Sequence, residues 1–239
     1  MEKERETGNR LDARRPCKRH VEGYIGYRPC THDYRCDDCE FEQFFLDHYR
    51  VHAVVQPVDT IKIRGFDVPQ GYYFHAGHTW AKVEGDQTVR IGLDDFAFKT
   101  LGPFDRLDVP LIGKEIHQDR PTVTVYRDGH RSAVRSPLSG IVTAVNQDLL
   151  EDARAAFDHP YADGWLLTAH ATALRSDLKQ LMIDQETKTF MRKEVDELFG
   201  LIEETLGPMP NDGGDIRGDL YGEAPEIGWD RLSRLVFKA

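Results

Sequence analysis

The sequence predicts a mainly β fold with helical additions. Three observations support this fold class: a central region of short β-prone runs separated by turns, a helical apolar stripe near the C-terminus, and a compact group of four cysteines near the N-terminus. The 239 residues suffice for one sizeable domain with appendages, or for two small ones. Composition divides the chain into four regions. They are a basic tail (1–16), a Cys-containing head with one helix (17–57), a β-rich core region (71–183) and a helical extension (184–239).

The charge balance excludes some classes of partner. The chain has 31 Lys and Arg against 41 Asp and Glu, a net charge of −10, which argues against nucleic-acid binding because phosphate neutralisation needs an excess of basic residues. No apolar run approaches the roughly 20 residues of a membrane-spanning helix. The first 20 residues lack the apolar segment of a secretory signal, so we expect a cytoplasmic protein in which disulfides are disfavoured.

The head contains all four cysteines of the chain, with the spacing C-x12-C-x5-C-x2-C: Cys17, Cys30, Cys36 and Cys39. Four thiolates are able to close a tetrahedral zinc site, and they are also able to hold an iron–sulfur cluster. A head of about 40 residues has too small a core without such a staple. Two alternatives stay open, a redox-active dithiol and four ordinary reduced cysteines.

A helix is expected over residues 40–52, because Phe41, Phe45 and Tyr49 recur at helical spacing. Its N-terminus would lower the pKa of Cys39, but the neighbouring carboxylates oppose thiolate formation and favour a bound cation. His48 and His52 are four residues apart on this helix, and we expect them to be structural rather than metal ligands.

The core region reads as strands at residues 79–86, 88–92, 122–126, 133–136, 141–145 and 165–169, with a two-turn helix at 148–157. Asp128-Gly129 lies between two β-prone runs and predicts a type I′ hairpin turn. In the extension, an apolar stripe from Met191 to Leu206 predicts one amphipathic helix that ends at Gly207-Pro208. A loop follows at 209–218 and a last element at 228–237, where Trp229 and Phe237 suggest docking on the core.

A series of short motifs in the core region resembles the glycine cleavage H protein over about residues 71–183. These motifs are His78-Thr-Trp80, Val83-Glu-Gly85, Ile91-Gly-Leu-Asp-Asp95, Leu101-Gly102, Val109-Pro110, Ser136-Pro-Leu-Ser-Gly140, Val145-Asn146, Pro160-Tyr161 and Gly164-Trp-Leu166. The resemblance implies a barrel-sandwich hybrid of the lipoyl- and biotinyl-carrier type. It also implies a hairpin tip whose lysine, amide-linked to lipoate, carries an aminomethyl group between partner enzymes.

The chain departs from that family at the attachment residue. Counting back from Ser136-Pro137, the position of the lipoyl lysine is Gly129, which offers no amine, so lipoate is not expected. The guanidinium groups of Arg127 and Arg131 are poor acyl acceptors. Either the hairpin is kept to close the sandwich and its tip has drifted, or Arg127, His130 and Arg131 form a basic tip that docks on an acidic partner.

The run Tyr34-Arg-Cys-Asp-Asp-Cys-Glu-Phe41 is similar to the leader of a Cys-containing variety of H-protein-like chains, which implies a place in redox metabolism. Three functions remain open. The first is a non-enzymatic adaptor for lipoyl-handling or redox enzymes, and the second is electron transfer through a zinc- or iron–sulfur-binding head. The third is a working lipoyl carrier modified at an unexpected lysine, for which Lys99, Lys114 and Lys179 are the candidates considered.

Overall fold

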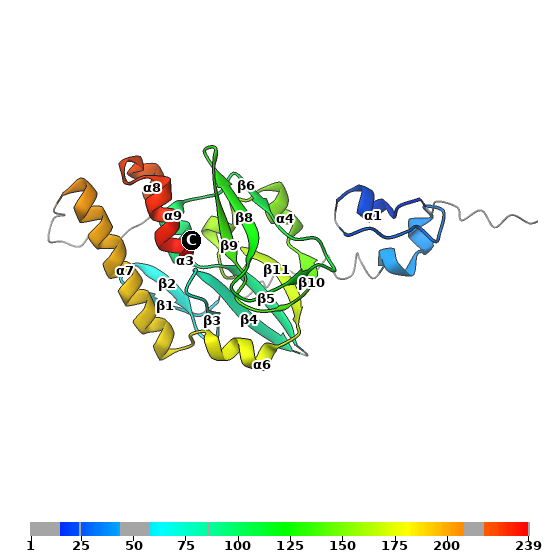
Figure 1. Cartoon of the computed structure of the whole chain (residues 1–239), viewed down its shortest axis with the longest axis horizontal. Coiled ribbons are helices and arrows are strands. Elements are labelled where there is room, and N and C mark those ends of the chain that lie inside the picture. Colours follow the sequence, from blue (N-terminus) through cyan, green and yellow to red (C-terminus); the bar gives the residue numbers. More distant parts are fainter. Residues whose placement is uncertain (1–14, 24, 44–57, 86, 208–217, 239) are drawn as a thin grey trace, which may run out of the picture.

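The fold is built on antiparallel sheets of six, three and two strands (Figure 1). Their buried side chains form one apolar core. The computed structural model describes residues 15–23, 25–43, 58–85, 87–207 and 218–238. The largest sheet has six strands, in the order β3 (Tyr73–Phe74), β4 (Thr79–Gly85), β5 (Thr88–Leu93), β11 (Trp165–Ala171), β10 (Gly140–Val145) and β7 (Glu115–Ile116). The mainly β fold class and the strands predicted along this sheet are confirmed.

The second sheet has three strands, in the order β6 (Arg106–Asp108), β8 (Pro121–Arg127) and β9 (His130–Arg135). Alternate residues of a strand face opposite sides, and Val123 and Val125 are buried in the core. Arg127 has the same parity as these two valines. Strand geometry alone therefore directs its side chain inward.

The core is rich in aromatic side chains, and Trp80 lies at its centre. The Trp80 indole is fully buried, and its Nε1 donates to the carbonyls of Leu93 at 2.8 Å and Pro160 at 3.2 Å. A Cβ at Gly92, opposite Trp80 in the β4–β5 register, would collide with the indole ring. Gly92 of the family-like motif is thus required, because the Trp80 indole ring approaches its backbone closely.

The C-terminal extension packs on the core. The helix α7 (Gln185–Leu206) buries one stripe, which includes Met191, Val195, Leu198 and Ile202. After it come α8 (Leu220–Glu223), the 3₁₀ turn η3 (Pro225–Ile227) and α9 (Trp229–Phe237), which lie beside α3 (Asp95–Leu101) in Figure 1. Trp229 and Phe237 are buried, so their predicted docking is confirmed.

Several elements differ from the sequence expectation, and two of the differences have a clear local cause. A hairpin of β1 (Thr60–Ile63) and β2 (Phe66–Pro69) was not predicted, because its Arg64-Gly65 turn lacks the usual Asn-Gly or Asp-Gly signal. The helix expected at 148–157 is two helices, α4 (Gln147–Glu151) and α5 (Ala155–Asp158). Asp152 leaves the helical conformation, and its carboxylate accepts from the Arg154 amide at 3.1 Å, an Asx turn that separates them.

The helices between β11 and α7 are short: α6 (Leu174–Asp177) runs into the 3₁₀ turn η2 (Leu178–Gln180). The head contains α1 (Lys18–Val21), the 3₁₀ turn η1 (Cys36–Asp38) and a helical turn at residues 40–43. The rest of the helix predicted to residue 52, with His48 and His52, lies outside the described residues, as does most of the predicted loop at 209–218. In the described part of the chain, no helix is both long enough and apolar enough to cross a bilayer.

Candidate functional site

The tip of the β8–β9 hairpin adopts the tight turn that the sequence predicts. Arg127 pairs with His130, and Asp128 and Gly129 connect them with φ angles of 48° and 80°. Positive φ at both positions is the requirement of a type I′ turn, so the prediction is confirmed. A Cβ on Gly129 would meet no atom within 4 Å. A side chain at this position would therefore project into open space.

Beside the tip, Arg127 is buried and paired with the C-terminal extension. Its side chain is 9% exposed, and its guanidinium makes a two-pronged ion pair with the Asp219 carboxylate, with Nη1 2.5 Å from Oδ1. Nη1 also donates to the Leu101 carbonyl, and the Tyr221 ring centre lies 5.0 Å from the guanidinium carbon. Burial alone would lower the pKa of Arg127, but the bond to Asp219 and its charge raise it.

Two glycines make room for this ion pair. Gly102 follows α3 with a φ of 72°, and Gly222 lies within α8. A Cβ at either position would collide with the Arg127 guanidinium and the Asp219 carboxylate. The chain therefore encloses the pair between the end of α3 and the short helix α8.

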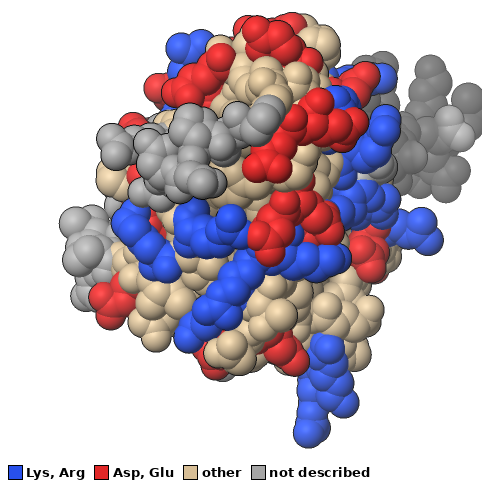
Figure 2. All heavy atoms as spheres, turned by 90° about the vertical axis from the view of Figure 1, so that its left-hand side faces the viewer, with Lys and Arg blue, Asp and Glu red and all other residues tan. Residues whose placement is uncertain are grey.

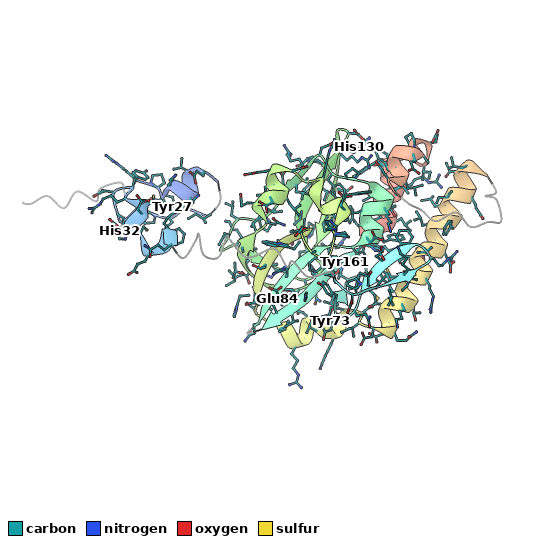
Figure 3. The ribbon with its side chains drawn as sticks, turned by 180° about the vertical axis from the view of Figure 1, so that it is seen from behind. Tyr27, His32, Tyr73, Glu84, His130 and Tyr161 are labelled. Carbon is teal, nitrogen blue, oxygen red and sulfur yellow. The ribbon has the colours of Figure 1, made fainter. Side chains whose placement is uncertain are left out.

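On the other flank of the turn, His130 lies beside the C-terminal extension (Figure 3) and contacts its aromatic side chains. Its ring stacks on Trp229 with a centroid distance of 5.8 Å and meets the edge of Tyr221 at 6.2 Å. The Trp229 Nε1 donates to the Ser132 hydroxyl of β9 at 3.0 Å. The hairpin is consequently held on both flanks by residues of the C-terminal extension.

These contacts correct one prediction. A freely exposed basic tip of Arg127, His130 and Arg131 is wrong for Arg127, because strand parity directs it inward and Asp219 neutralises it. His130 stays exposed but has one face covered by Trp229. Arg131 is exposed. In this arrangement the tip is far less basic than its sequence suggests.

In the head, the backbone brings the four cysteines around one cavity. Cys17 and Cys30 lie on neighbouring segments. The Cys17 amide donates to the Arg28 carbonyl and the Cys30 amide donates to the Arg15 carbonyl, both at 2.7 Å. Cys36 and Cys39 are joined by one 3₁₀ turn, with the Cys39 amide 3.1 Å from the Cys36 carbonyl. All four thiols are free and half-buried, and all four residues line the same cavity.

The thiols are nevertheless not arranged as a metal centre. Within the described residues, no three His, Cys, Asp or Glu side chains form a group able to hold a metal ion, so the metal site stays a prediction. Burial and the nearby Glu42 carboxylate raise the pKa of Cys36. A raised pKa disfavours the thiolate, which argues against Cys36 as a reactive free thiol.

A second polar group is buried beneath α7. His78 is fully buried, with Nδ1 2.7 Å from the Asp94 carboxylate and Nε2 3.4 Å from the Glu194 carboxylate. Glu194 also accepts from Lys238 Nζ at 2.6 Å. Burial lowers the pKa of His78, but the two carboxylates outweigh it and raise the pKa. His78 therefore has a structural role, and the network ties the core to α7 through Glu194 and to the end of α9 through Lys238.

His75 behaves in the opposite way. Its Nδ1 accepts from the Gly77 amide at 3.0 Å, so the ring proton lies on Nε2 and is donated to Asp119 at 2.9 Å. Burial lowers the pKa of His75 more than Asp119 raises it. This imidazole is therefore a neutral structural group.

The alternative lysines lie away from the hairpin tip. Lys99 is on α3, where its ammonium pairs with Asp95 at 2.7 Å and donates to the Gly65 carbonyl at 2.9 Å. Lys114 precedes β7 and Lys179 lies in η2. None of the three belongs to β8, β9 or their turn.

Sequence reasoning missed Asp219, Tyr221 and Glu194. Glu194 falls on the apolar stripe of α7, three residues after Met191, and a charged residue on a buried stripe signals a buried partner. Asp219 precedes an apolar residue and caps α8, accepting from the Gly222 amide at 2.8 Å. Its pairing with Arg127 has no local signal, because the two residues are far apart in sequence.

Comparison with known proteins identifies similar chains. The family model described as glycine cleavage H-protein matches residues 72–194. A probable glycine cleavage system H protein of Thermococcus kodakarensis is 31% identical over 132 residues, which cover 55% of this chain and 98% of that protein. The glycine cleavage system H protein of Mycobacterium leprae is 36% identical over 124 residues, covering 51% and 93%. A solved H protein from Mycobacterium marinum aligns with a TM-score of 0.43 and 25% identity over 44% of this chain and 87% of that chain.

Proposed function

This chain belongs to the glycine cleavage H-protein family, and from that premise we propose that it is a non-catalytic adaptor of the carrier fold. It works without lipoate and docks on lipoyl-handling or redox enzymes. The members of this family to which the chain is similar are carriers rather than catalysts. A sandwich without its covalent arm keeps the docking surfaces of a carrier but has nothing on which to carry a group.

The observation that carries the proposal is Gly129 at the tip of the β8–β9 hairpin. The tip is a tight turn with open space around Gly129, the position that the family resemblance assigns to the attachment lysine, and glycine offers no amine for an amide bond. The neighbouring Arg127 is buried in an ion pair, and Lys99, Lys114 and Lys179 lie on other elements. The described part of the hairpin therefore supplies no substitute amine.

Mass spectrometry of the full chain, purified from cells with active lipoylation, tests this proposal. We expect no covalent lipoyl mass under denaturing conditions. Gly129→Lys is the matched variant, because its side chain would project into open space while its positive φ costs about 1–2 kcal/mol. A lipoyl mass on the unaltered chain would overturn the proposal, and a lipoyl mass on the variant alone would support it.

Binding to a partner tests the adaptor role separately. We expect the immobilised chain to enrich purified lipoamide dehydrogenase or aminomethyltransferase over a bead control. Binding of either enzyme without any turnover by the chain itself supports an adaptor. If neither enzyme is enriched over the bead control, the proposal is contradicted.

A second candidate function rests on the head, where all four cysteines line one cavity. Backbone hydrogen bonds place Cys17 near Cys30 and Cys39 near Cys36, and a four-thiolate site would need the four sulfurs to close further around one ion. A zinc ion or an iron–sulfur cluster bound there would stabilise the small head, and a cluster would also allow electron transfer.

Native mass spectra of the same samples decide this second candidate. A metal mass that is lost on denaturation would support it, and visible absorbance of anaerobically purified protein would separate a cluster from zinc. Cys36→Ser should lose the metal and keep the folded core. A native mass equal to the denatured mass would contradict metal binding.

A further inference from the structure

The two helices that follow α7 are held in different ways. The helix α9 buries a continuous apolar face of Trp229, Leu232, Val236 and Phe237. Its C-terminal neighbour Lys238 pairs with Glu194 and Glu197. This helix is anchored by apolar burial and is part of the folded core.

The helix α8 is less firmly held, although it buries Leu220 in the core and its Tyr221 ring meets Trp229 of α9 at 5.3 Å. It has four residues, which is far below the length at which a helix is stable by itself. The side-chain links that fix it to the hairpin are the Asp219–Arg127 ion pair and the placement of the Tyr221 ring near that guanidinium and His130. The Asp219 side chain is 26% exposed, so water and competing groups reach this ion pair.

Releasing α8 would change the charge of the tip. With Asp219 in place, the Arg127 guanidinium is neutralised and the Tyr221 ring lies over it. Without Asp219, the Arg127 guanidinium would keep its inward direction on the same face as the paired His130 but would lose the carboxylate that neutralises it. On the face of the molecule in Figure 2, basic and acidic side chains are interspersed. An Arg127 guanidinium released from Asp219 would offer a charge-complementary contact to a carboxylate of a partner.

We propose that α8 is an intramolecular latch over the hairpin tip. Asp219 and Tyr221 occupy the surface on which a partner docks, and a partner segment that presents a carboxylate beside an aromatic ring displaces them. This inference rests on the proposed adaptor function, since it requires a partner that docks at the tip. The anchored α9 keeps the displaced latch close, and rebinding competes with the partner.

The sharpest test removes the latch contacts without removing the helix cap. Asparagine is as good an N-cap residue as aspartate, so Asp219→Asn keeps the bond to the Gly222 amide and loses the charge. Tyr221→Ala is added to remove the ring. Glu226→Gln is the matched control, an acid-to-amide change at an exposed position of the same extension.

Two measurements are made on the full chain. Amide hydrogen exchange reports opening, and we expect faster exchange at residues 127–132 and 219–223 in the double variant but not in the control. Biolayer interferometry with lipoamide dehydrogenase reports docking, and we expect binding at least about tenfold tighter in the double variant, because the competent state is more populated. Added salt should narrow this difference, since it weakens the partly exposed ion pair.

The outcomes distinguish the latch from the adaptor function. Unchanged exchange in the double variant, or binding no tighter than in the unaltered chain, overturns the latch while leaving the adaptor function standing. If exchange is faster but no variant binds lipoamide dehydrogenase, that enzyme is not the partner, and the docking role of the latch is contradicted. Faster exchange with tighter binding supports both.

Discussion

At the scale of single residues, the buried His78 side chain connects several elements of the fold. It has a φ of 55°, and its backbone is held by bonds to the His75 carbonyl and the Asp94 amide. Its imidazole stacks on Phe96 at 4.2 Å and contacts the carboxylates of Asp94, which caps α3, and of Glu194 in α7. A charged imidazole between two buried carboxylates is stable only because each charge faces an opposite one.

The charge of His78 leads to a prediction about stability and pH. Its pKa is raised above the ordinary value of 6.5, so its contribution is fully present below pH 6.5 and is lost as the pH rises through the folded-state pKa. Burial raises the pKa of Glu194, but His78 and Lys238 lower it below 4.5 overall, so its contribution is lost as the pH falls through the folded-state value. Both contributions are complete between pH 4.5 and 6.5.

We expect His78→Asn to lower the free energy of unfolding by about 3–5 kcal/mol in that window, and by less at higher pH. Asparagine tolerates positive φ, so the backbone conformation is kept. Urea unfolding from pH 4.5 to 9 measures the difference, with the exposed His117→Asn as control. A loss of stability that is independent of pH would mean that His78 is neutral in the fold.

At the scale of elements, the helix α8 and the end of α3 are shaped by the ion pair between them. Gly222 lies in a helix, where glycine is usually a weak choice, and Gly102 ends α3 with positive φ. Each occupies a position at which a Cβ would collide with Arg127 and Asp219. The need for space therefore overrides helix propensity at Gly222.

This explanation predicts opposite effects for two helical glycines. Gly222→Ala should destabilise the chain by about 1–3 kcal/mol, because the new methyl group displaces the Asp219 carboxylate. Gly200→Ala is the matched control in α7, where a Cβ meets no atom within 4 Å, and should stabilise by about 0.5–1 kcal/mol. Thermal unfolding measures both, and a stabilising Gly222→Ala would show that the pair is not tightly enclosed.

At the scale of the whole molecule, the C-terminal extension connects two distant places. Its α8 end holds the hairpin tip through Asp219, and its α9 end reaches the His78 network through Lys238. Among the described residues of the head, Ile25 forms a β-bridge with Ile112, and Gly23 lines a pocket with core residues that include Leu107. The extension is thus an integral part of the carrier sandwich, whereas the described residues of the head add nothing to its buried core cluster.

Local patterns predicted a large part of this fold. The Asp128-Gly129 turn, the β4–β5 pair and the helix α7 follow from turn chemistry and from the periods of strand and helix, which act within a few residues. The β1–β2 hairpin was missed, since Arg64-Gly65 carries no strong turn signal. The break at Asp152 was also missed, because a single side-chain bond to the Arg154 amide decides it.

The sequence by itself determined the family motifs, the four-cysteine head and the presence of glycine at position 129, since each is a matter of residue identity and spacing. Only the tertiary structure decided that Arg127 is neutralised by Asp219 and that the extension covers the flanks of the tip. Strand parity turns Arg127 inward, but its partner is brought from 92 residues away by the apolar burial of α9. Ion pairs between distant segments depend on how the whole chain packs, and no local period encodes that.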